Sequence, residues 1–328
     1  MCQFCLTRRP ASLAPFSSHR RAWLTLGAAA LATPALAQVD VGNASRLRSL
    51  VPAEDLEQAA QQQYSEVIAK AKAEGQLAPA GDAQLQRLRR IAQRLVAQAG
   101  PWNERAGQWQ WEINLIRADD INAWCMPGGK IAVYTGLLTK LQLSDDEVAM
   151  IVGHEMAHAL REHAREQLAK QTATGAGLSI VSSLFGLGDL GNTLANLGGQ
   201  LLVLKFSRND ETEADLVGLE IAARAGYNPR ASISLWNKMM ANDGGQGGFL
   251  STHPSGPNRI RQLEANLGKV QGLYEKSRVA QTRLPQRAVG THQSTTAPAA
   301  GPSTSPSAPP ARSGEQPGAF QTPVGRPL

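Results

Sequence analysis

The stretch SDDEVAMIVGHEMAHAL, residues 144–160, carries both a helix signal and a chemical motif. Ser144 and Glu147 have the spacing of a capping box, in which the side chain of each residue accepts a hydrogen bond from the backbone N–H of the other. From residue 148 to residue 160 the chain is apolar, and Glu155 is the only acid or base of permanent charge there. The stretch therefore predicts a buried helix that begins after Ser144.

Within that helix, His154, Glu155 and His158 form an H-E-x-x-H motif. Residues four apart lie on one face of a helix, so both imidazoles can reach a single metal ion. Glu155 lies about 100° round the helix, where it can hold an attacking water without being a ligand. Zinc suits two imidazoles and a carboxylate and lowers the pKa of bound water. We expect a zinc site with Glu155 beside the water that the metal binds.

The third ligand is expected to be a carboxylate from a later helix, because no H-x-x-G-x-x-H extension follows the motif. His163 is nine residues after His154, about 180° round a continuous helix, and is expected to face away, at the surface or behind the ligands. The stretch SRNDETEAD, residues 207–215, offers Glu211, Glu213 and Asp215. Glu211 and Asp215 share a face, so one can ligate while the other accepts a hydrogen from a ligating imidazole.

The order of four motifs resembles a known family. H-E-x-x-H is followed by S-R-x-x-E-x-x-A-D at residues 207–215, and is preceded by N-A-x-x-x-P-G-G-x-I at residues 122–131. The fourth motif is T-H-P at residues 252–254, with Arg259 downstream. Over about 80–265 the chain is similar to the HtpX-type and CaaX-prenyl-protease-type zinc metallopeptidases, a gluzincin group.

This resemblance implies a role for each matching residue. It makes His154, His158 and Glu211 the ligands of one zinc per chain, Glu155 the general base, and Asp215 the partner of a ligating histidine. It makes His253 an electrophilic partner for the oxyanion, although a histidine before a proline can also be an ordinary loop residue. For Asn122 the alternatives are a turn residue and a residue that binds substrate backbone by β-addition.

The fold class is expected to be α+β and mainly α, with a gluzincin core, a metal helix bearing the H-E-x-x-H motif, and a small β-sheet at the substrate edge. Apolar periodicity and cap signals predict helices over 52–74, 82–99, 211–225, 231–240 and 258–266. Alternation and turn residues predict strands over 109–115, 122–124 and 131–134. The expected segments are a signal peptide (1–37), an N-terminal helical segment (38–78), a zinc metallopeptidase domain (79–280) and a disordered Pro/Ser/Thr-rich tail (281–328).

Residues 1–37 have the pattern of a secretory signal peptide: Arg20-Arg21, an apolar run, then Ala35-Leu36-Ala37. Paired arginines before an apolar run also fit the twin-arginine route. The net charge of +6 comes from the ends of the chain, because residues 38–286 hold 26 basic and 26 acidic residues. A neutral core excludes a nucleic-acid partner. A periplasmic location is expected.

Two further features bear on the site. The stretch 175–204 holds seven glycines among Leu, Ile, Val and Phe, with Asp189 its only charge. It is expected to form a lid-like helical hairpin over the site, or to touch a bilayer surface. Cys125 is the only cysteine left once Cys2 and Cys5 leave with the signal, and is expected to be a buried, inert thiol.

These observations predict an exported zinc metalloendopeptidase, and the family resemblance implies misfolded or unassembled envelope proteins as its substrates. One alternative is an envelope chaperone or scaffold that retains the zinc site but rarely cleaves. Another is a latent protease whose segment 175–204 covers the site until an unfolded client displaces it.

Overall fold

The computed structural model describes residues 39–173, 201–202, 204–242, 248–254 and 258–283. The expected signal peptide, almost all of the segment 175–204 and the tail beyond residue 283 lie outside the described residues. The chain divides into a compact unit of residues 1–284 and a second unit, 285–328. The elements are η1 (Arg46–Leu50), α1 (Ala53–Ala73), α2 (Ala83–Val96), η2 (Glu104–Gly107), β1 (Glu112–Ile116), β2 (Ala123–Met126), β3 (Lys130–Tyr134), α3 (Thr135–Lys140), α4 (Asp145–Leu160), α5 (His163–Ala173), α8 (Arg208–Arg224), α9 (Ala231–Ala241), α10 (Phe249–Thr252) and α11 (Asn258–Arg283).

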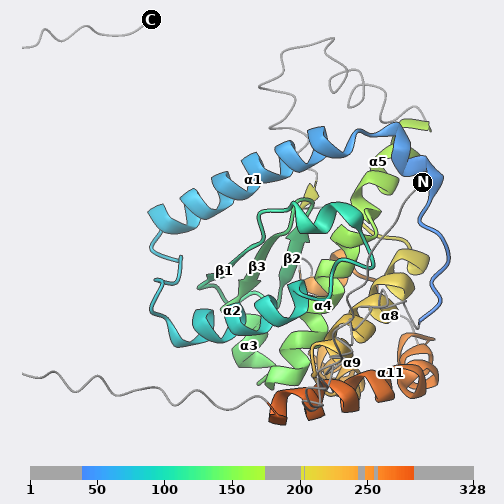
Figure 1. Ribbon diagram of the computed structural model, residues 1–328. Coiled ribbons are helices and arrows are strands. Elements are labelled where there is room, and N and C mark those ends of the chain that lie inside the picture. The colour runs from blue at the N-terminus through green and yellow to red at the C-terminus, as the bar shows by residue number, and fades with distance from the viewer. Residues whose placement is uncertain (1–38, 174–200, 203, 243–247, 255–257, 284–328) are drawn as a thin grey trace, which may run out of the picture. The chain divides into compact units, whose positions relative to one another are not determined.

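The sheet has three strands in the order β1-β3-β2 (Figure 1). β1 runs parallel to β3, and β2 runs antiparallel to β3 with Cys125 opposite Ile131. The turn between β2 and β3 contains Gly128 and Gly129, both with φ of +79°. A side chain at Gly129 would also come within 2.7 Å of the Trp111 ring, so this tight turn requires glycine. In this sheet order, β2 is an edge strand.

Helices cover both faces of this sheet. Because side chains of a strand alternate between its two faces, Ile131 and Val133 lie on one face and Ala132 on the other. Ile131 and Val133 pack in the main core with α2 and α4, whereas Ala132 packs with Ala71 of α1. Tyr64 of α1 donates a hydrogen bond to the carbonyl of Ile131 at 3.3 Å. The region 38–78 thus contributes α1 directly to the packing of the sheet.

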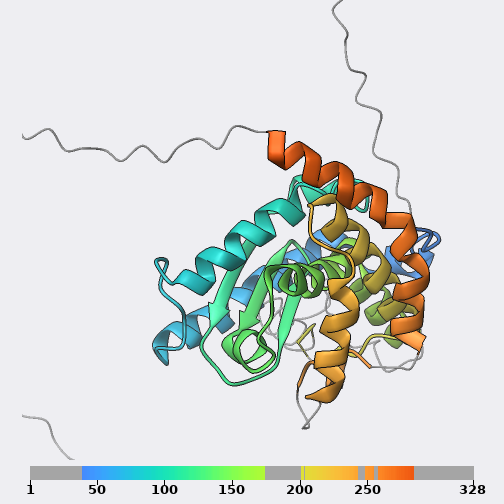
Figure 2. The same cartoon turned by 90° about the horizontal axis from the view of Figure 1, so that it is seen from below.

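The central helix is α4, which packs against β2, α2, α8 and α9. Its closest neighbour is α8, and the two backbones approach each other at Gly153 and Gly218. A Cβ at Gly218 would lie 2.7 Å from the backbone nitrogen of His154, and one at Gly153 would lie 3.0 Å from the carbonyl oxygen of Gly218. α11 packs along the outside of α8 and α9 (Figure 2).

The α+β, mainly helical fold class is confirmed, and several predicted boundaries are wrong. α8 begins at Arg208 rather than at 211, because Ser207 caps it. The helix predicted over 258–266 continues to Arg283. The strand predicted from 109 begins at Glu112. Within the described residues, no helix has the length and hydropathy needed to cross a membrane.

Candidate metal centre

His154 and His158 lie next to each other on the inner face of α4. The expected capping box fixes the start of this helix: Glu147 accepts a hydrogen bond from the Ser144 nitrogen at 2.8 Å, and Ser144 accepts one from the Glu147 nitrogen at 3.3 Å. Both histidine side chains are buried. Their Nε2 atoms are 3.1 Å apart, so both point at the same place.

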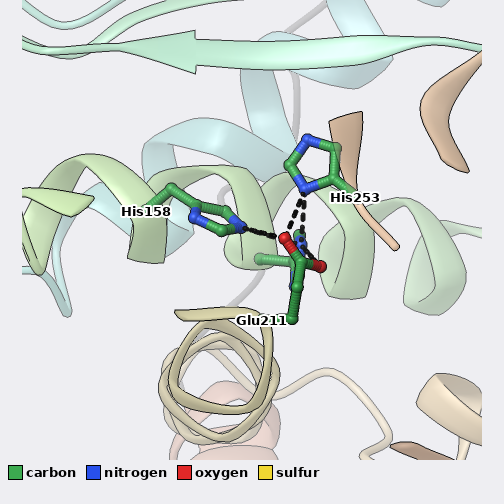
Figure 3. A group of neighbouring side chains, drawn as sticks. His158, Glu211 and His253 are labelled. Atoms are coloured by element: carbon green, nitrogen blue, oxygen red, sulfur yellow. Dashed lines mark hydrogen bonds and ion pairs between the residues drawn. The ribbon is translucent and has the colours of Figure 1, made fainter. Parts of the chain in front are cut away.

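Glu211 reaches the two imidazoles from α8. Its Oε1 lies 3.4 Å from His158 Nε2, and its Oε2 lies 3.6 Å from His154 Nε2. The side chain is buried in the first turn of α8, which Ser207 and Asp210 begin with a second capping box. Figure 3 shows His158 and His253 pointing toward the Glu211 carboxylate from two sides.

His253 comes from the end of α10 and completes the cluster. Its Nδ1 lies 3.1 Å from Glu211 Oε1 and 3.4 Å from His154 Nε2. Its Nε2 faces Glu155 Oε1 at 3.6 Å. Together, His154, His158, Glu211 and His253 offer ligand atoms that all lie within 4.8 Å of one another. These four buried side chains are therefore able to hold a metal ion.

Asp215 and Arg259 support the cluster from behind. Asp215 Oδ1 lies 3.0 Å from His154 Nδ1, the ring nitrogen that points away from Glu211. Arg259 donates two hydrogen bonds of 2.7 Å to the Asp215 carboxylate, and its Nη1 lies 2.7 Å from Glu211 Oε2. The guanidinium itself stacks 3.5 Å above the Trp236 ring. This arrangement fixes both carboxylates and orients the His154 ring.

Burial and neighbouring charged or polar groups act on the pKa values of the side chains in this cluster. Burial alone would raise the pKa of Glu211, but the imidazoles of His158 and His253 close to its carboxylate lower it below its usual range. Burial would also raise the pKa of Asp215, and the Arg259 charge lowers it instead. For His158, burial lowers the pKa far below its usual value. The centre thus combines ionised carboxylates with a neutral imidazole, the states in which both ligate metals.

Glu155 is the acid whose environment differs most from that of Glu211. It is buried, and its Oε1 accepts no hydrogen bond from the described residues. Burial raises the pKa of Glu155, and the charge of Glu211 raises it further, although His253 and His154 act in the opposite direction. A buried carboxylate with a free oxygen and a raised pKa is suited to accept a proton.

A small cavity of about 50 Å³ opens between β2 and the cluster. Asn122, Cys125, Glu155 and His253 all line it. The Asn122 side chain accepts a hydrogen bond from the Ala123 nitrogen at 2.9 Å, which places it at the start of the edge strand. Cys125 is half-buried rather than buried, because it lies on the side of β2 that faces this cavity. Burial and the Glu155 charge raise the pKa of its thiol.

The position of His163 corrects the sequence reasoning. A continuous helix would turn His163 away from His154, but α4 ends at Leu160 and Glu162 has a φ of +60°. The turn brings His163 back, so that its Nδ1 lies 3.0 Å from His158 Nδ1. Glu213 points away from the cluster as expected, and its carboxylate contacts Arg161 and His163 instead. His163 is therefore buried behind His158, and its surface alternative is wrong.

Comparison with known proteins identifies the family. The model of peptidase family M48 matches residues 82–267, more than half of the chain, and covers the whole cluster. The chain therefore belongs to peptidase family M48. It is 35% identical over 192 residues to the mitochondrial metalloendopeptidase OMA1 of Schizosaccharomyces pombe, covering 57% of this chain and 54% of that one.

Two further relatives extend the comparison. The OMA1 of Arabidopsis thaliana is 42% identical over 159 residues, which are 48% of this chain and 32% of that protein. The metalloprotease LoiP of Escherichia coli is 30% identical over 190 residues, which are 57% of this chain and 72% of LoiP. The chain thus spans about half, or less, of the length of these OMA1 relatives.

Proposed function

We propose that this member of peptidase family M48 is a zinc-dependent metalloendopeptidase. In this proposal His154, His158 and Glu211 are the ligands of one zinc ion per chain, and Asp215 holds the His154 ring. The convergence of two Nε2 atoms and one carboxylate on a single buried point carries the proposal. Two imidazoles and one glutamate are a set that zinc uses in hydrolases, and they leave a position open for water or substrate.

The charge of the centre supports a divalent cation. Glu155, Glu211 and Asp215 are buried acids, and Arg259 is the buried base that contacts two of them. Glu211 and Asp215 are the acids whose pKa values are lowered, and Arg259 offsets only one of their two negative charges, so this buried group keeps an excess of negative charge. Burying such an excess is costly unless it is compensated, and a Zn²⁺ ion would compensate it.

Bound zinc would supply Lewis-acid chemistry, by acidifying a water and polarising the scissile carbonyl. Glu155 then acts as general base and accepts the proton of the attacking water, a role that suits its free Oε1. His253 donates its Nε2 proton to the oxyanion that forms on the carbonyl. Its Nε2 faces Glu155 across the cavity, so both side chains are within reach of one scissile bond.

The substrate is proposed to be a polypeptide that lies extended along β2. An edge strand offers unpaired backbone groups to an added strand, and Asn122 at its start would bind the substrate backbone. Leu204 and Phe206 line the same cavity, which favours apolar side chains next to the scissile bond. A nucleic-acid partner is not part of this proposal, because the core is neutral.

We further propose that the protein is exported to the periplasm and acts on misfolded or unassembled envelope proteins. Support for this comes from the signal-like residues 1–37 and from the similarity to a bacterial metalloprotease, LoiP. The OMA1 relatives, by contrast, are named as mitochondrial. In the same proposal 38–78 and 79–280 form the folded enzyme, 281–328 is a tail, and 175–204 is a lid or a peripheral membrane contact.

A latent form of the enzyme is the second candidate. The position of His253 Nδ1, 3.4 Å from His154 Nε2 and 3.1 Å from Glu211 Oε1, favours it. A nitrogen at that place can occupy the fourth position of the metal, which the attacking water needs. In this form the protein would resemble a chaperone or scaffold that keeps its zinc and cleaves little.

Cleavage of casein by the purified mature chain, with and without a chelator, tests the proposal. Elemental analysis should find about one zinc per chain, and chelation should abolish cleavage. Glu155→Gln should retain both the zinc and the fold and lose proteolysis, because an amide does not accept the proton. Full casein cleavage by Glu155→Gln, or by a zinc-free wild-type chain, would contradict the mechanism.

A further inference from the structure

His163 is a buried imidazole that the proposed mechanism leaves without a role. It begins α5 and is 1% exposed. Its Nδ1 lies 3.0 Å from the Nδ1 of His158, the ring nitrogen that points away from Glu211. Two imidazole nitrogens at this distance share one proton, so one of them donates and the other accepts.

The other side of the His163 ring faces a carboxylate. His163 Nε2 lies 3.4 Å from Oε2 of Glu213. The same oxygen accepts a hydrogen bond from Arg161 Nε at 2.9 Å, while Asn209 donates to the other oxygen at 2.9 Å. Arg161 and His163 are both buried, and the Glu213 side chain is 15% exposed. A line of four side chains thus runs from Arg161 to His158.

The guanidinium of Arg161 sets the direction of the hydrogen bonds along this line. A guanidinium only donates, so the Glu213 carboxylate is an acceptor for Arg161. As an ionised acceptor, Glu213 requires the proton of His163 to be on Nε2. His163 Nδ1 is then the acceptor, and the proton of His158 is on its own Nδ1. Consequently His158 Nε2 carries a free lone pair and points at Glu211 and His154.

We propose that His163 is a positioning residue, which holds His158 in the tautomer and ring orientation that binds the metal. The inference rests on the proposed function, in which His158 is a zinc ligand. The ring of His154 is oriented directly by a carboxylate, because Asp215 Oδ1 lies 3.0 Å from its Nδ1. For His158 the carboxylate is that of Glu213, and the His163 imidazole lies between the two. Partners of this kind typically change metal affinity by about 10–100-fold when they are removed.

The test compares the zinc affinity of full-length variants by competition with a chromogenic chelator. His163→Phe keeps a ring of similar size and removes both nitrogens, and the Kd for Zn²⁺ should rise by about 10–100-fold. His163→Asn should recover part of that loss, because its side-chain oxygen can accept from His158. In ¹⁵N-histidine spectra of the metal-free protein, His158 should be in the Nδ1–H tautomer in the wild type and should lose that preference in His163→Phe.

Glu213→Gln leaves every ring in place and serves as a second variant if His163→Phe does not fold. The amide can donate to His163, which frees His163 to protonate Nδ1, so zinc affinity should again fall. Glu162→Gln is the matched control. Glu162 is a buried acid one residue from His163, paired with Arg48 at 2.8 Å and Arg165 at 2.5 Å. This variant should lose stability while its zinc affinity stays unchanged.

The outcomes separate this inference from the proposed function. A wild-type chain that binds no zinc would overturn the proposed function. A wild-type chain that binds zinc, with the same Kd and the same His158 tautomer in His163→Phe or Glu213→Gln, would overturn the role of His163. An equal loss of zinc affinity in Glu162→Gln would also overturn it, because the effect would then be structural.

Discussion

Gly218→Ala tests how closely α4 and α8 must approach to build the metal centre. The added Cβ would lie 2.7 Å from the His154 nitrogen, 2.8 Å from the Gly153 carbonyl carbon and 2.9 Å from the His154 Cα, where ordinary contacts begin at 3.4 Å. All three atoms belong to the backbone, so no rotamer change relieves the overlap. The helices must separate locally by about 0.7 Å, the shortfall of the closest contact. Overpacking of this kind costs about 1–3 kcal/mol.

Gly268→Ala is the matched control. Gly268 lies within α11, is exposed, and a methyl group added there would meet none of the described residues within 4 Å. Both substitutions gain about 1 kcal/mol of helix propensity. The difference in unfolding free energy between the two variants therefore isolates the overlap and should be about 1–3 kcal/mol. At about 2–4 °C per kcal/mol for a domain of this size, Gly218→Ala should melt well below Gly268→Ala.

The same displacement should reach the metal centre, because α8 carries Glu211 and Asp215 while α4 carries the two histidines. Thermal melting and chelator competition for Zn²⁺ are the two assays. Gly218→Ala should bind zinc more weakly than wild type, and Gly268→Ala should bind it equally well. If Gly218→Ala is as stable as Gly268→Ala and binds zinc as tightly, the close approach of the helices is not what positions Glu211.

Glu211→Gln should reduce the zinc content of the purified chain, by more than Glu213→Gln does, because only the first change removes a ligand; the reverse order would contradict the ligand assignment. His253→Ala should lower the turnover of short peptides by about 10²–10³-fold, and in a latent enzyme it should also speed the loss of zinc to a chelator. If neither peptide turnover nor chelator kinetics changes, His253 is an ordinary loop residue. Truncation after Gln286 should leave melting temperature and specific activity unchanged, and a large loss of stability would mean that the tail docks onto the core.

Much of the fold can be predicted from local sequence signals such as helix caps and turn glycines. The Ser144–Glu147 capping box sets the start of α4, and the glycine pair before β3 sets the turn of the sheet. The fold class and the family are predictable because metal chemistry demands particular residue types at a particular helical spacing. The same spacing singles out His154 and His158, whereas it leaves both Glu211 and Asp215 open as the third ligand, and Glu211 is named only by the resemblance to the family. Boundaries are harder, since Ser207 extends α8 by a cap that the apolar pattern does not mark.

The residues that orient the proposed ligands have no fixed spacing in the sequence. Helical periodicity puts His163 on the far side of a continuous helix, and a single residue in the left-handed region, Glu162, reverses that conclusion by ending α4 and restarting the chain. Gly153 and Gly218 escape sequence reasoning for a related reason: whether a helical glycine is required depends on a second backbone that packs against it. Ligands must be imidazoles or carboxylates on one face, whereas any hydrogen-bonding group that a turn delivers can orient them. Sequence patterns therefore predict the side chains of the proposed metal centre better than the contacts that orient those side chains.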